Sequence, residues 1–549
     1  MASSLRMKIR QVWPLGFTPK LVTVLSEGYA VAQFRSDLLA GLTVAVVALP
    51  LSMAIAIACG VSPDRGLITA IIGGFLVSLL GGSRFQIGGP AGAFIVLVGA
   101  TVIRHGVDGL VLATLLSGIF LTVAGGLRLG TFVKYIPYPV TIGFTAGIGL
   151  IILASQITPF LGLSPPTAEP GPLLEKLTFL LPLIGGFNPV SAAVAFAVVL
   201  AIYALRRLRP DLPGMLIAIS GAAFVTYLFD LKIATVASQF GELARGLPMP
   251  RLPDLSTEKV IAVLPDALGF TLLGAIESLL SAVVADSMTG RRHRSNMELV
   301  AQGIANIGVS FFGGFCVTGT IARTATNVRA GAHGPVAGML HSVALLFVLM
   351  LLAPLAGAIP LAALAGVLVM IAWHMIDFRA IAGFLRSNRP EAAVLLTTLL
   401  LTVFRDLIEA IVIGVALGSF IFTRRMSQLT SVHHHDVEVP FGDGVITDPN
   451  TAVIRISGAF FFGSAPIADS VLDRIAAKPT RLVLDLSEVQ LLDTTGANSL
   501  LNAIRQARKQ GIAVRLCGLD APQKAMLTNI GMTSDDANVA SSLAVALQD

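Results

Sequence analysis

Charged residues are scarce in this sequence. Only 13% of its 549 residues are charged, whereas 54% are apolar and the mean hydropathy is +0.82. A soluble domain carries about 25% charged residues, so this chain has too few charges to cover a surface that faces water. We therefore expect most of it to lie in a membrane, which excludes a cytosolic enzyme, a nucleic-acid-binding protein and a disordered scaffold.

Cysteines and catalytic motifs are scarce as well. The three cysteines, Cys59, Cys316 and Cys517, lie far apart and form neither a disulfide framework nor a metal-binding spacing. Gly-Lys does not occur, which excludes the phosphate-binding loop of an ATP-driven pump, and no HExxH or GxSxG constellation is present. We therefore expect no enzyme activity, no cofactor and no metal, and an ion gradient must drive any accumulation of a solute.

Long apolar stretches fill the first three quarters of the chain. A membrane span needs about 20 predominantly apolar residues. By this measure the sequence predicts fourteen spans, at 38–58, 64–81, 90–104, 108–126, 133–157, 188–205, 212–229, 262–286, 297–314, 320–331, 335–356, 359–375, 390–404 and 406–423.

The distribution of basic residues predicts the orientation. The first 37 residues lack the apolar core and cleavage site of a signal peptide, and we expect them to form a cytoplasmic tail. With both chain ends inside, the inner segments carry 20 Lys and Arg residues and the outer loops carry 8. This bias is the one that membrane proteins show toward the cytoplasm.

The composition changes after residue 425. Residues 433–549 contain 13 acidic and 9 basic residues, a net charge of −4, which leaves +10 for the rest of the chain. Short apolar runs at 452–456 and 481–486 precede a helical pattern at 497–510, which indicates a small soluble α/β domain. We therefore expect a tail over 1–37, a transmembrane domain over 38–425, a linker over 426–440 and the α/β domain over 441–549.

The third and tenth spans are interrupted. Residues 90–103 would form a helix of about 21 Å, which is shorter than a hydrocarbon core of about 30 Å. The segment near 318–331 is short and polar, and both segments follow Gly-rich stretches. Seven spans separate them, so the halves 38–229 and 262–423 read as an inverted repeat. Paired interrupted helices in matching halves indicate the binding site of a transporter.

The chemistry of these interrupted helices favours an anion. A helix N-terminus presents unpaired N–H groups and about +0.5 of an elementary charge, and Arg323 adds a full charge at one of them. Gly88, Gly89 and Gly92 would leave the backbone open to a ligand. The alternative is that the glycines only allow tight helix packing.

Glu277 lies near the middle of the eighth span. A carboxylate there costs at least about 2.5–3.5 kcal/mol, so it must face a cavity, pair with a cation or be protonated. A Glu that takes up a proton as an anion arrives would couple uptake to the proton gradient. The alternatives are a structural ion pair with Arg323, or a cation held with the help of Ser281 one turn further on.

Several motifs resemble the SulP family of sulfate permeases. The tail resembles a STAS domain through DLS at 485–487 and LDTTG at 492–496. Together the resemblance covers about 37–540. In the membrane part it is carried by LPLSMAIA at 49–56, GGSR at 81–84, IGGP at 87–90, AIES at 275–278 and the stretch 320–323.

The resemblance implies a membrane all-α fold of seven plus seven spans, with core and gate domains, and an added cytoplasmic α/β STAS domain. It also implies a homodimer in the bacterial inner membrane that moves its core like an elevator. Many members carry Gln at position 51 and an aromatic residue at 55, where this chain has apolar residues. The anion site then comprises Leu51, Ile55, Gly89, Ala91, Gly92, Ala322, Arg323 and Thr324, with Glu277 and Ser281 as ion-coupling residues.

The functional hypothesis is proton-coupled symport of a small oxyanion, sulfate or a C4-dicarboxylate. The alternative is a sodium-coupled bicarbonate carrier, although sodium-coupled members carry Asp where this chain has Glu277, which favours protons. A nucleobase carrier and a membrane-tethered scaffold with a cytoplasmic STAS partner are further alternatives. Thr495 occupies the position that is phosphorylated in stand-alone STAS proteins, unless Thr494 and Thr495 only cap the helix that follows.

Overall fold

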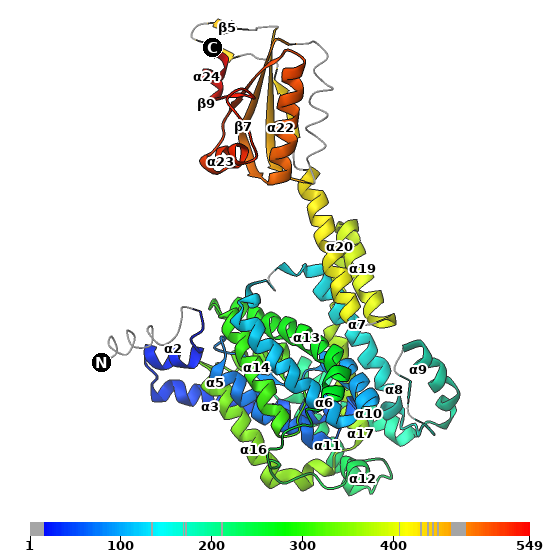
Figure 1. The fold of residues 1–549 in the computed structure, drawn as a ribbon. Helices are drawn as coiled ribbons and strands as arrows, with labels where there is room; N and C mark the ends of the chain where they lie inside the picture. The colour runs from blue at the N-terminus through cyan, green and yellow to red at the C-terminus, as the bar shows by residue number, and fades with distance from the viewer. Residues whose placement is uncertain are drawn as a thin grey trace. The chain divides into compact units, whose positions relative to one another are not determined.

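The computed structural model describes two compact units, which divide between residues 415 and 416 (Figure 1). Each unit is described by itself. Residues 1–15 of the expected tail and part of the expected linker lie outside the described residues. The described residues are 16–132, 135–167, 169–170, 173–209, 212–405, 407–428, 431–435, 439–441, 444–446, 450–462 and 479–548.

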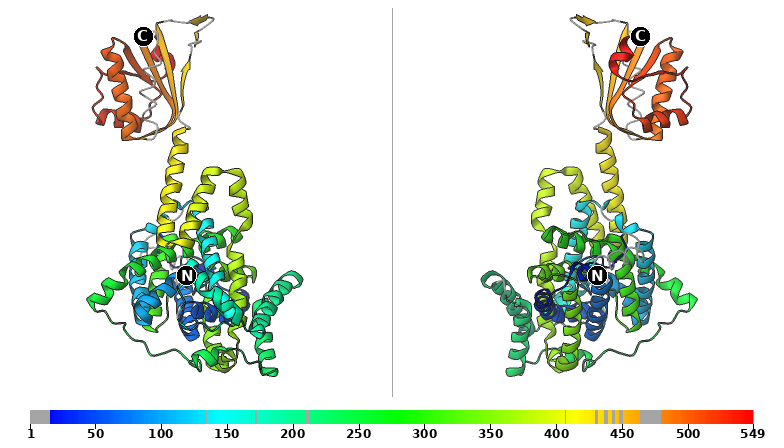
Figure 2. Two further views of the ribbon diagram at one scale, coloured as in Figure 1. Left: turned by 90° about the vertical axis from the view of Figure 1, so that its right-hand side faces the viewer. Right: turned by 90° about the vertical axis from the view of Figure 1, so that its left-hand side faces the viewer.

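The first unit is helical. Eight described helical segments are long and apolar enough to cross a membrane, and the last of them, Leu407–Gln428, extends from the first unit into the second. Figure 2 shows the helical unit from two further sides. Each of the fourteen predicted spans coincides with a helix or a run of short helices. In order, they are α3 (Val31–Ala58), α4 (Pro63–Ile68) with η1 (Thr69–Gly73) and α5 (Gly74–Leu80), η2 (Gly92–Phe94) with α6 (Ile95–Gly126), α7 (Tyr138–Ser155), α10 (Pro189–Leu208), α11 (Gly214–Leu228), α13 (Thr257–Thr289), α14 (Ser295–Phe311), α15 (Ile321–Arg329), α16 (Val336–Gly357), α17 (Leu361–Met375), α19 (Arg389–Phe404) and α20 (Leu407–Gln428).

Helix ends differ from the predicted spans where polar residues continue a helix. Helix α3 begins at Val31 rather than at residue 38, and α13 begins at Thr257 rather than at 262. Hydropathy marks only the apolar stretch, whereas polar residues also form helical turns. The third and fourth spans lie within α6, whose helix breaks at Gly106 with φ of 67°. Shorter helices outside the spans are α8 (Ile157–Leu161), α9 (Leu173–Leu180), α12 (Val236–Phe240) and α18 (Phe378–Ser387).

Part of the expected N-terminal tail belongs to the membrane unit. Helix α2 (Lys20–Glu27) is held there because the Lys20 N–H donates to the Gly81 carbonyl at 2.8 Å and Lys20 Nζ donates to the Arg292 carbonyl at 2.7 Å. Arg84 binds both carboxylate oxygens of Glu27, at 2.5 and 2.6 Å. Burial lowers the pKa of Lys20 to about 8. Residues 20–27 of the expected tail are therefore attached to the membrane unit.

The second unit contains the predicted α/β domain. Its five-stranded sheet has the order β3-β6-β7-β8-β9, with β3 antiparallel to β6 and the remaining neighbours parallel. Buried apolar side chains of β6 and β7 pack with those of α22 in the core, as the alternating pattern predicts. The elements are β3 (Ser431–His435), β4 (Val439–Phe441), β5 (Gly444–Ile446), β6 (Thr451–Phe460), β7 (Arg481–Leu492), α22 (Thr494–Lys509), β8 (Ala513–Cys517), α23 (Ala521–Asn529), β9 (Asn538–Ala540) and α24 (Leu543–Gln548).

Candidate functional site

Two very short strands hold the interrupted helices together. Strand β1 (Gly88–Gly89) pairs antiparallel with β2 (Thr318–Gly319), so that Gly88 lies opposite Gly319 and Gly89 opposite Thr318. Helical turns begin at Gly92 after β1 and at Ile321 after β2. The starts of the two interrupted helices therefore lie beside one another. This strand pairing is not among the predictions from the sequence, and its one local signal is the Gly-rich stretch before each segment.

Hydrogen bonds between the two segments extend beyond the strand pair. The Thr320 N–H donates to the Ile87 carbonyl at 3.0 Å, and the Ile87 N–H donates to Thr324 Oγ1 at 3.1 Å. Asn327 Nδ2 donates to the Phe85 carbonyl at 2.9 Å. These bonds attach the first two turns of α15 to the chain that leads into β1, so the two segments are fixed as one body.

Arg323 is fully buried in α15 beside this strand pair. Its Nη2 donates to Ser52 Oγ at 3.1 Å and to the Pro90 carbonyl at 3.3 Å. Its Nε and Nη1 have no hydrogen-bond partner among the described residues. The expected alternative of an ion pair with Glu277 is wrong, since Arg323 contacts neutral acceptors instead. A buried cation without a counter-charge costs several kcal/mol, so this arrangement favours an anion nearby.

The glycines near Arg323 have different roles. A Cβ atom at Gly89 would lie 2.1 Å from Arg323 Nη1, and a Cβ atom at Gly88 would lie 2.8 Å from Val77. These two glycines therefore give room to protein side chains, which is the packing alternative. Gly92 differs, because the nearest atoms to its Cβ position are on Ile152 and Met375, at 3.6 and 3.8 Å. Of the three, only Gly92 has room for a methyl group, which would lie at ordinary contact distance from α7 and α17.

The remaining predicted site residues belong to α3, to the segment before η2, and to α13 and α15. Leu51 and Ile55 of α3 are buried, as is Ala91, which precedes the first turn of η2. Ala322 is exposed in the first turn of α15. Ser281 Oγ donates to Thr324 Oγ1 at 3.0 Å, so these two predicted residues contact each other across α13 and α15.

Glu277 lies in α13, which packs against η2, β2 and α15. Its side chain is 7% exposed. One turn earlier, the Gly274 carbonyl accepts a hydrogen bond from Thr318 Oγ1 at 3.1 Å. The ring of Phe270, two turns before Glu277, packs edge-on against Phe94 of η2, with centroids 6.0 Å apart. The predicted coupling residue is therefore on the helix that contacts both interrupted segments.

A cleft of about 1220 Å³ opens in the membrane unit at the C-terminal end of α3. It is lined by Ala54 and Ile95, which are neighbours in sequence of Ile55 and Phe94. The cleft therefore reaches the edge of the candidate site. Its charged lining residues are Arg104, Glu169, Lys176, Lys232 and Arg405, and each basic residue among them has an acidic partner.

In the STAS-like unit, Asp493 caps helix α22. Its Oδ1 accepts a hydrogen bond from the Gly496 N–H at 2.7 Å. Thr494 and Thr495 are the first two residues of the helix and are exposed. The expectation that these threonines cap the helix is therefore wrong. The position of Thr495 leaves its side chain open to solvent.

Comparison with known proteins gives the family. Residues 34–398 match the sulfate permease family, and residues 445–546 match the STAS domain. This chain belongs to the sulfate permease family. Members of the sulfate permease family are transporters rather than enzymes, and the apolar helices agree with a multi-pass membrane protein. The predicted fold class, a helical membrane unit with an α/β STAS domain, is confirmed.

Relatives within the sulfate permease family match nearly the whole chain. YvdB of Bacillus subtilis, a candidate sulfate transporter by its name, is 38% identical and covers 92% of this chain and 95% of its own. The bicarbonate transporter BicA of Synechocystis is 33% identical over 91% of this chain and 90% of its own.

Solved structures show the same fold. The transmembrane domain of a cyanobacterial BicA superposes with a TM-score of 0.63 at 33% identity, covering 70% of this chain and 98% of that chain. SLC26A9 superposes with a TM-score of 0.85 at 18% identity, covering 98% of this chain and 93% of that chain.

Proposed function

We propose that this sulfate permease family member is a secondary active transporter of a small oxyanion, with sulfate or a C4-dicarboxylate as the substrate. The observation that supports the proposal most directly is the burial of Arg323 beside the starts of two helices, with two guanidinium nitrogen atoms that have no partner in the described part of the chain. An oxyanion beside Arg323 would supply the missing counter-charge and accept hydrogen bonds from backbone N–H groups. The likeness to YvdB agrees with sulfate.

We propose an elevator-type movement, and the division of contacts around the site supports it. Helices α3, α13 and α15 contact the strand pair or Arg323, whereas Gly92 faces α7 and α17 across ordinary contact distances. The contacts of Gly92 with Ile152 and Met375 are apolar, so they could separate without breaking a hydrogen bond if the first group moved against the second. In this proposal the first group is the core, the second belongs to the gate, and the anion travels with the core.

Coupling to protons is assigned to Glu277. We expect a proton on this carboxyl group to accompany the anion, because a neutral side chain crosses the bilayer at lower cost than a carboxylate. In proteoliposomes, Glu277→Gln should abolish accumulation driven by an inward proton gradient but preserve exchange of internal for external anion. Accumulation by the variant at the wild-type level would show that the proton acts elsewhere.

Sodium-coupled bicarbonate transport is the second candidate, and the likeness to BicA favours it. The experiment that separates the candidates is uptake of labelled sulfate, succinate, fumarate and bicarbonate at two pH values, with sodium or with choline. Uptake of bicarbonate only, and only with sodium, would overturn the first proposal. Failure of the wild type to transport any of the four anions would overturn both.

The remaining expectations form part of the proposal. They are a homodimer, both chain ends in the cytoplasm of a bacterial inner membrane, and a cytoplasmic partner of the STAS domain. Thr495 is the proposed phosphorylation site, and its exposure in the first turn of α22 agrees with access by a kinase. The proposed transmembrane domain spans 38–425, and the STAS domain spans 441–549 after a linker over 426–440.

A further inference from the structure

Helix α14 carries four buried polar side chains on one face, and the last of them, Ser310, donates to Ile307 within the same helix. The first three, Glu298, Gln302 and Asn306, are each at most 1% exposed, and they follow one another at intervals of four residues. This spacing places them in one row along the helix. Buried polar side chains in a membrane helix are costly unless their hydrogen bonds are made, so their partners indicate their role. We call these three residues the polar ladder of α14.

Asn306, at one end of the ladder, binds the residue that precedes β2. Its Oδ1 accepts from the Val317 N–H at 3.0 Å, and its Nδ2 donates to the Val317 carbonyl at 2.9 Å. The same Nδ2 donates to the Gln302 carbonyl at 2.8 Å. Both backbone groups of Val317 are thus held by one side chain, as a neighbouring strand would hold them. Helix α14 therefore holds the backbone at the start of β2 in place.

Glu298, at the other end of the ladder, binds the segment that leads into β1. Its Oε2 accepts from the Ser83 N–H at 3.0 Å, and its Oε1 accepts from Gln302 Nε2 at 3.0 Å. Nearby, the Arg294 N–H donates to the Gly82 carbonyl at 2.9 Å. One helix therefore holds the chain before both strands of the candidate site, although it supplies no predicted anion contact itself.

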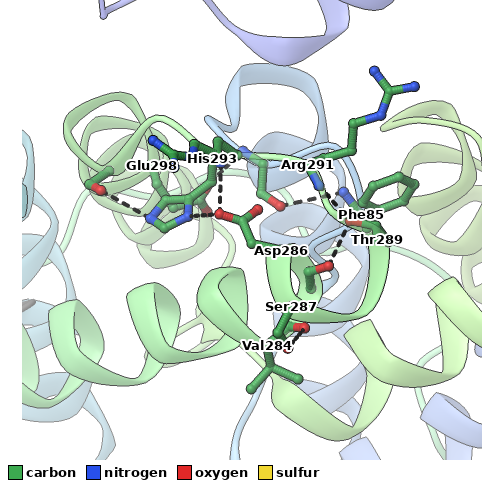
Figure 3. Close-up of polar contacts among 12 residues, drawn as sticks. Phe85, Val284, Asp286, Ser287, Thr289, Arg291, His293 and Glu298 are labelled. Carbon is green, nitrogen blue, oxygen red and sulfur yellow. Dashed lines mark hydrogen bonds and ion pairs between the residues drawn. The ribbon is translucent and has the colours of Figure 1, made fainter.

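The start of α14 is itself attached to the helix that carries Glu277. Asp286, near the end of α13, accepts from the His293 N–H at 2.9 Å, and its Oδ2 lies 2.7 Å from His293 Nδ1 (Figure 3). On the other side of the ring, His293 Nε2 lies 3.0 Å from Ser295 Oγ in the first turn of α14. The N-terminal end of α14, from which the polar ladder starts, is therefore attached to α13.

We propose that Glu298, Gln302 and Asn306 are positioning residues that hold β1 and β2 in register and thereby set the affinity for the transported anion. The proposal rests on the proposed function, because it assigns the anion to the helix starts that these strands place. Without the ladder, β2 would occupy its paired position in only a fraction of the molecules. The apparent affinity would fall by that fraction, while the molecules that bind anion would still transport it.

The test compares Asn306→Leu with Ser310→Ala in purified full-length protein. Asn306→Leu keeps a side chain of similar size but loses all three bonds, whereas Ser310 lies one turn further along α14 and donates only to Ile307 within the same helix. For radiolabelled sulfate in proteoliposomes, we expect the KM of Asn306→Leu to rise about tenfold with a maximal rate within about twofold of wild type. A tenfold rise corresponds to about 1.4 kcal/mol. Ser310→Ala should leave both values unchanged.

A conservative substitution separates hydrogen bonding from charge. The Oε1 of Gln302 has no partner among the described residues, so rotation of this amide would let it accept from the new amide of Glu298→Gln. Glu298→Gln should therefore keep a KM close to wild type, and Glu298→Leu should resemble Asn306→Leu. If Glu298→Gln is as impaired as Glu298→Leu, the side chain acts through its charge and the proposed ladder is wrong.

Amide hydrogen exchange provides a readout that does not depend on transport. Asn306→Leu should speed exchange of the Val317 amide and of β2, and Ser310→Ala should not. Gln302→Met, which keeps the shape of the side chain, supplies a milder variant if Asn306→Leu does not fold, and we expect about a threefold rise in its KM. Wild-type KM and wild-type exchange in the leucine variants would overturn the positioning role. A wild type that transports no sulfate, with faster exchange in Asn306→Leu, would instead overturn only the proposed substrate.

Discussion

Replacing Gly89 by alanine tests the geometry of Arg323 directly. The added methyl group would lie 2.1 Å from Arg323 Nη1 and 3.1 Å from its Cζ. The guanidinium cannot swing into solvent, because Arg323 is fully buried and its Nη2 is bound to Ser52 and Pro90. Either the side chain or β1 must therefore move, and forcing extra volume into a packed interior costs about 1–3 kcal/mol.

This cost should appear both in stability and in anion binding. We expect Gly89→Ala to lower the thermal midpoint of the purified protein and to raise the KM for sulfate about fivefold or more, since about 1.4 kcal/mol is a factor of ten. The matched control is Gly221→Ala in α11, where no atom lies within 4 Å of the added Cβ. That variant should keep the wild-type KM and should be as stable as the wild type or slightly more stable.

A Gly89→Ala protein with the thermal midpoint and KM of the wild type would contradict this prediction. It would mean that the guanidinium does not lie against the backbone of β1, and the counter-charge argument for an anion would lose its basis. A lower thermal midpoint with an unchanged KM would contradict only the link between Arg323 and the anion.

Two further predictions concern charged groups outside the spans. Because burial lowers the pKa of Lys20 to about 8 from the 10.5 of the unfolded chain, the unfolded state binds more protons between these values, and stability should rise with pH across this interval. Lys20→Met should remove that rise in thermal melts between about pH 7 and about pH 10, and an equal rise in the variant would exclude Lys20 as its source. Asp493→Ala should destabilise α22 by about 1 kcal/mol, because its cap is lost. Hydrogen exchange at the Gly496 amide should speed up in this variant but not in Thr494→Val, and equal effects of the two would assign the cap to the threonine after all.

The membrane spans were predictable because hydropathy is a property of single segments. Each of the fourteen predicted spans coincides with helical structure, and the interruptions at the third and tenth spans follow from Gly, Pro and polar residues that cannot continue an apolar helix. The two helix starts and Arg323, which favour an anion, could also be predicted from the residues of each segment alone. Helix ends were less predictable, because polar residues extend α3 and α13 beyond their apolar stretches.

Partnerships between distant segments could not be read from the sequence. Strands of two residues have no periodicity, so the pairing of Gly88 with Gly319 had no local pattern beyond glycine content. The hydrogen-bond acceptors of Arg323 are Ser52 on α3 and the Pro90 carbonyl before η2. From the sequence alone, Glu277 was an equally plausible partner of Arg323. The N-terminal residues around Lys20 looked like a tail because their partners lie more than 50 residues away.

The apolar identity of Leu51 and Ile55 restricts how this site could distinguish anions. With no side-chain donor at either position, discrimination depends on Arg323, the helix starts and hydroxyl groups such as that of Thr324, and the first two respond to charge. A unit charge about 4 Å from the guanidinium gains about 4 kcal/mol at an effective dielectric constant of about 20, and a dianion gains about twice as much. Each neutral acceptor that an anion would displace, Ser52 or Pro90, contributes only about 1 kcal/mol. In the proposed function, this charge attracts a small dianion such as sulfate more strongly than bicarbonate, and part of the gain offsets the larger hydration that the dianion loses. Bicarbonate gains half as much, so a bicarbonate carrier on this scaffold would need a second source of binding free energy, and a sodium ion near Glu277 is the one that the choline replacement would reveal.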